Sequence, residues 1–408
     1  MGIIIKRGYD LKRFRSLGSW VIIYGRRKTG KTFFVKKFLK WDEYYLVTRD
    51  GRIFDENFNE VSYEVLKDRM KREKERLFVI DEFHRLPNDF LDFLQMLDER
   101  MKIILVTSTL WRAKEKLKGN PTLGLFDHFR MGLIDERDML MELSGRIKEA
   151  RELVEACVYL REPILIRRYK GNVGNLITNF LFENKDIIER LIWEIFSEEE
   201  KELTSRYLVV LEAIASGKNE SGEIASELSK IFGERVNASY VQKYLKDLTE
   251  MGIIEKIKIY GKKRAKFYHV SPLLDLHFYL NAKYGYAERD VPKEFIASVV
   301  KEKIPLHVEH FFRNLLSKIF DLIPEKVVGP DLEIDIALLK FKEIEVVAEV
   351  KWTKFISKKE ILKIEEKLEN FKRSFLIVPD EKCLEYMPEK VEVLDIKRII
   401  ELLKEKRK

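Results

Sequence analysis

At 408 residues, the chain is long enough for about two to four domains, each with its own hydrophobic core. Its formal net charge of +8 permits contact with nucleic acid but does not require it. We find no signal-peptide pattern and no apolar run near the roughly 18 residues of a membrane span. We therefore expect neither membrane insertion nor secretion.

The cysteine content points to a reducing compartment. Cys157 and Cys383 are far apart and form no metal-binding or redox motif. We expect a cytoplasmic protein without disulfides. Glutamine is scarce beside abundant lysine, arginine and glutamate, a bias that suits a thermophile.

Residues 25–32 match the phosphate-loop pattern of glycine, four variable residues and Gly-Lys-Thr. An apolar run at 20–24 predicts a buried strand before the loop, and apolar spacing over 33–39 predicts a helix after it. Backbone N–H groups and the helix dipole would then face a bound phosphate, with Lys31 at the β- and γ-phosphates and Thr32 on Mg²⁺. The predicted nucleotide site comprises Gly25, Arg26, Arg27, Lys28, Thr29, Gly30, Lys31 and Thr32.

A second strand is predicted at 44–47, and a third at 77–80 that ends in two acids. Asp81 and Glu82 follow the apolar residues at the carboxyl end, where open α/β sheets bind their ligands. We expect Asp81 to hold Mg²⁺ through water and Glu82 to orient and deprotonate the attacking water. A strand that merely ends in solvated acids is the alternative, and the upstream phosphate loop disfavours it.

The next apolar strand, at 102–106, ends in hydroxyl side chains. Thr107 or Ser108 is the candidate sensor that hydrogen-bonds the attacking water or the γ-phosphate. An ordinary strand end followed by a helix cap explains either residue equally well. His84 is interpreted as a surface residue or one on the γ-phosphate side.

The loop at 25–32, the strand ending in Asp81-Glu82 and the strand end Val106-Thr107-Ser108 resemble the archaeal ATPase family of AAA-related, STAND-type P-loop ATPases. The resemblance implies ATP and Mg²⁺ as cofactors of a parallel-sheet domain at 1–134. It also implies that the helical pattern of 135–198 is a lid that responds to nucleotide state. The family's Gly-Arg pair after the sensor strand is missing here, and Arg130 is the candidate substitute.

Residues 199–284 show the winged-helix order of three helical patterns followed by a basic hairpin. One face of the third helix, with Ser239, is polar and would enter a major groove, while the hairpin tip would contact phosphate. The alternative is a winged helix that binds protein and carries lysines for solubility. The predicted DNA contacts are Gln242, Lys243, Lys246, Lys262, Lys263 and Arg264.

After a linker at 281–293, strand patterns at 332–338 and 344–352 predict an antiparallel hairpin. Strand alternation places Glu349 and Lys351 on one face, and pairing can bring Asp335 beside them. An aspartate followed by Glu-x-Lys on the neighbouring strand resembles the PD-(D/E)XK nucleases, whose restriction-endonuclease-like fold is an α/β/α domain.

The nuclease resemblance covers 285–408. It implies Mg²⁺ or Mn²⁺ on Asp335 and Glu349, water activation by Lys351 and a completing acid, Glu309, on the preceding helix. Such domains also serve as binding modules, so an inactive site is the alternative.

These expectations combine into a multidomain α/β protein: a P-loop NTPase sheet, a helical lid, an α+β winged helix and a nuclease-like domain. The expected function is that of a Mg²⁺-dependent ATPase whose nucleotide state controls DNA binding and phosphodiester cleavage. The alternative is a STAND-type, NTP-gated scaffold that binds DNA or protein and cuts nothing. DNA is the expected partner, and a homo-oligomer is left open.

Overall fold

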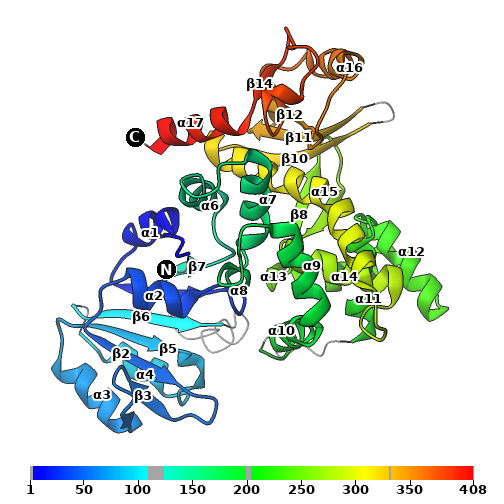
Figure 1. Cartoon of the computed structure of the whole chain (residues 1–408). Helices are drawn as coiled ribbons and strands as arrows, with labels where there is room; N and C mark the ends of the chain where they lie inside the picture. Colours follow the sequence, from blue (N-terminus) through cyan, green and yellow to red (C-terminus); the bar gives the residue numbers. More distant parts are fainter. Residues whose placement is uncertain (1–2, 99, 109–123, 199–203, 330–331, 408) are drawn as a thin grey trace.

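The computed structural model of the chain describes residues 3–98, 100–108, 124–198, 204–329 and 332–407 (Figure 1). Within these ranges the chain forms two seven-stranded sheets. The first sheet belongs to the N-terminal part, and the second lies near the C-terminus, with a body of helices between them (Figure 1). The arrangement is a multidomain α/β fold.

The first sheet has the strand order β4-β3-β2-β5-β6-β1-β7. Strands β2, β5, β6, β1 and β7 run parallel, whereas β3 and β4 are antiparallel additions at one edge. The strands are β1 (Trp20–Tyr24), β2 (Glu43–Val47), β3 (Ile53–Asp55), β4 (Glu60–Val61), β5 (Leu77–Asp81), β6 (Lys102–Thr107) and β7 (Asp127–Arg130). Apolar clusters cover both faces, which explains why the central strands are continuous apolar runs.

Short helices cover this sheet. They are α1 (Gly8–Arg15), α2 (Lys31–Phe38), α3 (Tyr63–Arg72), η1 (Phe83–Arg85) and α4 (Phe90–Gln95). Helix α2 begins directly after the glycine loop, and its Phe34 and Val35 are buried against the sheet. The predicted strand–loop–helix order is therefore present.

The segment predicted as a lid is helical throughout its described length. It contains α6 (Glu136–Leu143), α7 (Ala150–Leu160), α8 (Pro163–Ile166), α9 (Val173–Glu183) and α10 (Lys185–Glu198). Side chains that accept hydrogen bonds from first-turn N–H groups fix three of the helix starts: Asp135, Glu149 and Asn172. The positions of these caps explain why the segment breaks into short helices.

The next segment has the predicted order of three helices and a hairpin. These elements are α11 (Ser205–Ala215), α12 (Ser221–Phe232), α13 (Ala238–Glu250), β8 (Ile254–Ile259) and β9 (Ala265–His269), followed by α14 (Pro272–Tyr284). The buried side chains of α13, including Val241, Leu245 and Leu248, share one core with the lid helices. The lid and this segment therefore pack against each other around a common hydrophobic core.

The second sheet has the order β14-β13-β12-β11-β10-β8-β9, so the hairpin β8–β9 forms one edge of the C-terminal sheet. Its other strands are β10 (Ile323–Val328), β11 (Glu333–Lys340), β12 (Glu343–Val350), β13 (Ser374–Ile377) and β14 (Glu392–Leu394). Strand β10, which the sequence patterns did not indicate, pairs parallel with β8 and antiparallel with β11. The second sheet therefore combines strands from both sides of residue 284, the boundary predicted between the winged-helix domain and the nuclease-like domain.

Three helices and a short η3 (Glu381–Cys383) complete the C-terminal part: α15 (Lys293–Phe320), α16 (Lys358–Leu368) and α17 (Ile396–Arg407). Helix α15 shares an apolar cluster with Ile336 and Ala348, on one face of the hairpin β11–β12. Helix α16 shares a different cluster with Ala337 and Val347, on the other face. This separation of α15 from α16 decides which acids can meet.

Candidate functional site

The glycine loop connects the end of β1 to the start of α2 at the carboxyl edge of the first sheet. Gly25 has a φ of 150°, and a Cβ at this position would lie 2.1 Å from the carbonyl oxygen of Met131. Because Met131 also donates its N–H to Tyr24 at 2.7 Å, the two backbones cannot separate to make room. Only glycine fits at this start of the loop.

Lys31 lies inside the loop. Its Nζ donates hydrogen bonds to the carbonyl oxygens of Gly25 at 2.7 Å and Arg26 at 3.0 Å. Burial lowers the pKa of Lys31 to about 8, although Glu82 and Asp81 counteract the shift. The Lys31 ammonium is held among backbone carbonyls and is poorly solvated, so it is placed to donate hydrogen bonds to a phosphate oxygen.

Asp81 and Thr32 meet as predicted for a magnesium site. The Asp81 carboxylate accepts a hydrogen bond of 2.7 Å from the Thr32 hydroxyl and another of 2.7 Å from the Tyr44 hydroxyl. Burial raises the pKa of Asp81. Hydroxyl and carboxylate oxygens are ligands that Mg²⁺ prefers, so this pair fits the ion. Tyr44, which orients Asp81, lies on a neighbouring strand, and no local pattern marks it.

Glu82 and Ser108 stand together at the next two strand ends. The Ser108 hydroxyl lies 3.1 and 3.2 Å from the two carboxylate oxygens of Glu82. Thr107 instead places its hydroxyl 2.9 Å from Nδ1 of His84. His84 is buried, which corrects its interpretation as a surface residue. Of the two candidate sensors, Ser108 is the one that lines the cavity described next.

A cavity of about 780 Å³ opens between the glycine loop and the lid. Polar residues of the site, among them Lys31, Thr32, Glu82 and Ser108, form one part of its wall. The remainder is largely apolar, with Ile3, Ile4, Ile5, Phe33, Phe38, Ile134, Pro163, Ile164 and Ile166. An apolar compartment beside a phosphate-binding loop suits a molecule with a flat base and a phosphate chain.

Two arginines of the loop contact the lid, and Arg27 also lines this cavity. Arg26 forms a buried ion pair with Glu162 at 2.6 Å, and Arg27 contacts Glu194 at 3.0 Å. Glu162 directly precedes α8, whose Pro163 and Ile164 line the cavity. The side chain of Arg26 is therefore directed to the lid, which leaves its backbone to serve the predicted phosphate contact.

The comparison with protein families agrees with this geometry. Residues 18–131 match the family model described as AAA domain. This segment is an AAA domain. The match begins just before β1 and ends just after β7, so the AAA domain comprises the first sheet with its glycine loop. No curated protein matches the chain.

Solved structures resemble the chain weakly. The Walker-type ATPase of Pyrococcus abyssi is 18% identical with a TM-score of 0.47, covering 67% of this chain and 96% of that one. The Orc1 protein of Aeropyrum pernix, solved in complex with DNA, is 15% identical with a TM-score of 0.30, covering 71% and 96%. Cdc6p of Pyrobaculum aerophilum is 15% identical with a TM-score of 0.27, covering 73% and 94%. Similarity at this level does not extend the assignment beyond the AAA domain.

The second predicted site lies on the hairpin β11–β12. Ile336 pairs with Ala348, so Asp335 and Glu349 stand opposite each other on the α16 face. The Asp335 carboxylate accepts a hydrogen bond of 2.9 Å from the Val350 N–H, and Glu349 accepts one of 3.3 Å from the Asp335 N–H. Burial, and then the charge of Asp335, raises the pKa of Glu349.

Basic side chains surround this acid pair. Lys367 of α16 donates to Glu349 at 2.6 Å, and Lys351 lies 3.4 Å from Glu360. Lys351 thus shares the face of the acid pair but contacts a different carboxylate. The position of Lys367 depends on how α16 packs, so hairpin alternation could not indicate it.

Glu309 does not complete the site as expected. It belongs to α15, and its carboxylate pairs at 2.6 Å with Lys326, which also donates to the carbonyl oxygen of Asp335 at 3.0 Å. Among the described residues, no group of three or more His, Cys, Asp or Glu side chains is placed to hold a metal ion. The expected three-acid arrangement of Glu309, Asp335 and Glu349 is therefore not formed.

The predicted DNA-contacting residues divide into two groups. Gln242 of α13 and the hairpin residues Lys262, Lys263 and Arg264 line one cavity of about 500 Å³. Lys243 and Lys246 are exposed on α13, outside the lining of that cavity. The further lining residues that sequence reasoning missed are Ser221, Lys256, Lys258, Ala265 and Phe267.

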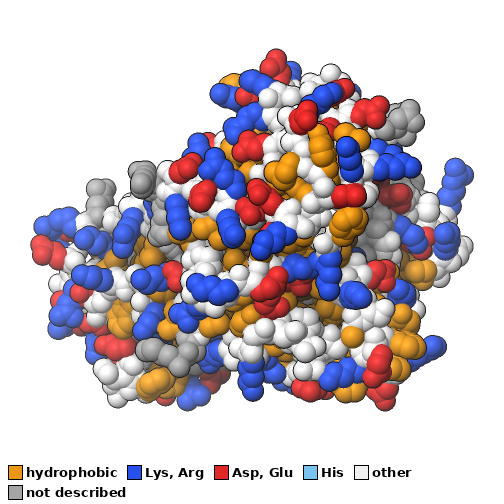
Figure 2. All heavy atoms as spheres, turned by 45° about the horizontal axis from the view of Figure 1, so that its top comes forward, with side chains coloured by type: hydrophobic (Ala, Val, Ile, Leu, Met, Phe, Trp, Pro, Cys, Tyr) orange, Lys and Arg blue, Asp and Glu red, His pale blue; other side chains and the backbone are white. Residues whose placement is uncertain are grey.

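The charge on the rest of the surface is mixed. On the face that Figure 2 shows, Lys and Arg side chains alternate with Asp and Glu rather than forming one basic stripe. The cavity beside the hairpin is thus a local concentration of positive charge.

Arg130, the proposed substitute for the family arginine, is exposed at the edge strand β7 and does not line the AAA cavity. None of the described helices is both long and apolar enough to cross a membrane.

Proposed function

We propose that this chain is a Mg²⁺-dependent ATPase whose nucleotide state controls the binding of DNA. The observation that carries the proposal is the convergence of Lys31, Thr32, Asp81, Glu82 and Ser108 at one edge of the AAA sheet. These residues come from two strand ends and from the glycine loop with the start of α2, which is the placement that phosphoryl transfer requires.

Each residue has a role that follows from its contacts. Lys31 would exchange its carbonyl partners for the β- and γ-phosphate oxygens, and Thr32 with Asp81 would hold Mg²⁺. When bound, the ion neutralises charge on the phosphates. Glu82 accepts the proton of the attacking water, and Ser108 keeps the Glu82 carboxylate in position.

The ion pairs of Arg26 and Arg27 supply a route from the phosphate loop to the lid. A shift of the loop on phosphate binding changes both pairs, and the lid shares its core with the segment that carries α13 and the hairpin. Movement of packed helices against one another is an established form of switching. We infer that the lid transmits nucleotide state to the basic cavity at the hairpin.

DNA is the proposed partner at that cavity. Five cations line the cavity beside Gln242 of α13: Lys256, Lys258, Lys262, Lys263 and Arg264. Phosphate contacts from lysine and arginine provide most of the affinity for nucleic acid. Gln242, the neutral polar member of the group, would contact a base edge.

Cleavage of DNA by the hairpin acids is the further proposal. The adjacency of Asp335 and Glu349 supports it, because two hard oxygen ligands on one face fit Mg²⁺ or Mn²⁺. The competing function is a STAND-type, NTP-gated scaffold that binds DNA or protein without cutting. Two ion pairs, Lys367 with Glu349 and Lys326 with Glu309, favour that alternative because they occupy carboxylates that a metal would need.

One set of assays distinguishes the two functions. Purified protein is incubated with linear, nicked, single-stranded and branched DNA, with and without ATP, in Mg²⁺ or Mn²⁺. We expect metal-dependent cleavage that Asp335→Asn removes while ATP hydrolysis continues. If no DNA form is cut but ATP is hydrolysed, the scaffold function replaces the nuclease. If Lys31→Ala leaves hydrolysis unchanged, the ATPase proposal itself is wrong.

A further inference from the structure

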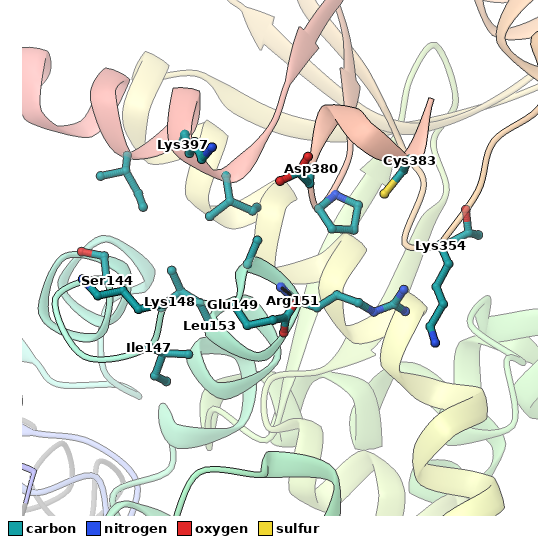
Figure 3. Close-up of a pocket in the computed structure, with 15 residues that line it drawn as sticks. Ser144, Ile147, Lys148, Glu149, Arg151, Leu153, Lys354, Asp380, Cys383 and Lys397 are labelled. Atoms are coloured by element: carbon teal, nitrogen blue, oxygen red, sulfur yellow. Dashed lines mark hydrogen bonds between the residues drawn. The ribbon is translucent and has the colours of Figure 1, made fainter. Parts of the chain in front are cut away.

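A second large cavity lies between the lid and the C-terminal domain. Its volume is about 550 Å³. One wall comes from the end of α6 and the start of α7, and the other from segments after β12 and β13 and from the start of α17. Figure 3 shows the two walls facing each other, with Lys148 and Arg151 on one and Asp380, Cys383 and Lys397 on the other. We call it the interdomain cavity.

Four cationic side chains line the interdomain cavity: Lys148, Arg151, Lys354 and Lys397. Arg151 lies 3.4 Å from Glu155 and donates to the carbonyl oxygen of Trp352 at 3.0 Å. Within the part of the chain that the structure describes, the three lysines form no ion pair with an acidic side chain. The three lysines are exposed, and none of the described acidic side chains pairs with them directly.

The acids of the lining do not neutralise these lysines, because backbone N–H groups occupy them. Glu149 accepts hydrogen bonds from the N–H groups of Arg151 and Glu152 at 2.9 and 2.5 Å. Asp380 accepts one from the N–H of Lys382 at 2.9 Å. Glu149 caps the start of α7 and Asp380 the start of η3, and four cations against these two acids leave the lining with an excess of positive charge.

Apart from Ser144, Thr353 and Cys383, the rest of the lining is apolar. Leu153 and Ile396 are buried, and the other apolar members are Ile147, Ala150, Pro379 and Ile400. Strands β12, β13 and β14 run parallel, and residues 353–354 and 379–380 follow the carboxyl ends of β12 and β13. That edge of a parallel sheet is where ligands bind in α/β domains. The combination fits an anion with a flat, weakly polar group attached.

We propose that the interdomain cavity binds a nucleoside phosphate, with its phosphate against Lys148, Lys354 and Lys397 and its base over Leu153, Ile396 and Ile400. The lining shares no residue with the AAA cavity, so this site is separate from the ATP site. The same chemistry is offered by a free nucleotide and by the terminal nucleotide of a nucleic-acid strand. A ligand between the two walls would hold the lid against the C-terminal domain.

The test uses the full chain carrying Lys31→Ala, which removes the phosphate-loop lysine. Two probes are titrated by fluorescence anisotropy: a methylanthraniloyl derivative of ADP and a fluorescein-labelled, 5′-phosphorylated oligothymidylate. We expect saturable binding of at least one probe that weakens as KCl is raised. Adding Lys354→Glu and Lys397→Glu should weaken that binding at least tenfold.

The matched control changes Lys404→Glu and Lys406→Glu, two exposed residues of α17 outside the interdomain cavity, with the same change of charge. Its affinity should stay within twofold, and melting temperatures check that all variants fold. Loss with the ADP probe identifies a free nucleotide, and loss with the oligonucleotide alone identifies a strand end. The proposal is wrong if neither probe binds, or if the control loses as much affinity as the cavity variant. Failure of ATP hydrolysis in the wild-type protein would leave this result unaffected.

Discussion

Lys31 is a buried lysine whose contacts and pKa predict its role at the phosphate loop. Its charge is held by two carbonyl oxygens, and its pKa is lowered to about 8 by burial. Replacing Lys31 with alanine removes the cation that those carbonyls position, so we expect ATP binding and hydrolysis to fall below detection. Isothermal titration and a phosphate-release assay measure both. Lys37→Ala, an exposed lysine on the same helix, is the control and should hydrolyse ATP normally.

The same lysine predicts a pH dependence. The lowered pKa means that a growing fraction of Lys31 is neutral as the pH rises through about 8. Phosphate contact favours the charged form, so binding of ATP at pH 8.5 should take up a proton, whereas binding at pH 6.5 should not. Titration calorimetry in two buffers of different ionisation enthalpy measures this uptake. Equal enthalpies in both buffers at pH 8.5 would show that Lys31 stays fully protonated in the free protein.

The lowered pKa of Lys31 also makes the free energy of unfolding depend on pH, in the opposite sense to a lysine whose pKa is raised by an ion pair. The unfolded chain holds the Lys31 proton up to its ordinary pKa of 10.5, and the folded chain releases it near 8. Folding stability therefore rises with pH between these two values, because the unfolded state binds more protons there. Burial of the charged lysine costs stability below pH 8 and is tolerated for function.

Glu82 is the residue that separates binding from turnover. Its carboxylate contacts Ser108 and lines the AAA cavity, whereas Thr32 and Asp81 form the magnesium pair without it. Glu82→Gln keeps the shape but removes the base, so we expect ATP affinity within a few-fold of wild type and hydrolysis reduced by about 10²-fold or more. Single-turnover hydrolysis of radiolabelled ATP provides the measurement. Undiminished hydrolysis would place the base elsewhere.

At the scale of elements, the ion pair Arg26–Glu162 joins the phosphate loop to the start of α8. The side chains of Arg26 and Glu162 are 5% and 1% exposed, so neither charge has an alternative partner in water. Glu162→Gln leaves Arg26 buried without its counter-charge, which costs about 3–5 kcal/mol of folding free energy. Urea unfolding monitored by circular dichroism measures the loss.

The exposed pair Arg52–Asp50 is the control for that experiment. Both side chains are 55% exposed and screened by water, so Asp50→Asn should change stability far less than Glu162→Gln. If Glu162→Gln has an equally small effect, the buried pair does not secure the loop to the lid. The double variant Arg26→Met with Glu162→Gln should recover part of the stability, because no buried charge then remains unpaired.

At the scale of the whole molecule, the shared sheet connects the basic hairpin to the acid pair. The pairing of β8 with β10 places the lysines of β8 on the same sheet as Asp335 and Glu349. DNA bound at the hairpin would thus meet a rigid surface that continues toward the acids. A flexible wing could not position a phosphodiester in this way.

The DNA proposal is tested by the salt dependence of binding. Replacing Lys256, Lys258, Lys262 and Lys263 with alanine should weaken DNA binding and reduce the slope of log K against log salt by about one for each lost phosphate contact. Anisotropy titrations between low and high KCl measure the slope. Alanine at Lys404 and Lys406 removes charge without touching the cavity and should preserve the slope. An unchanged slope in the cavity variant would end the proposal.

The sequence by itself determined the features that depend on residues close together in the chain. The glycine loop, its strand and its helix are contiguous, and the phosphate-binding geometry follows from that order. Asp335 and Glu349 also meet on one hairpin as anticipated, although a register shift between Leu338 and Leu339, which the sequence did not indicate, sets the residues that stand opposite each other. The polar face of α13 follows from helical spacing.

Only the tertiary structure decided how distant segments meet. It alone placed Tyr44 on Asp81, Glu162 on Arg26 and Lys367 on Glu349, and it paired Glu309 with Lys326. It also joined the basic hairpin to the C-terminal sheet through β10. Local spacing specifies which face a side chain occupies, whereas the partner that covers this face depends on packing between segments far apart in the chain.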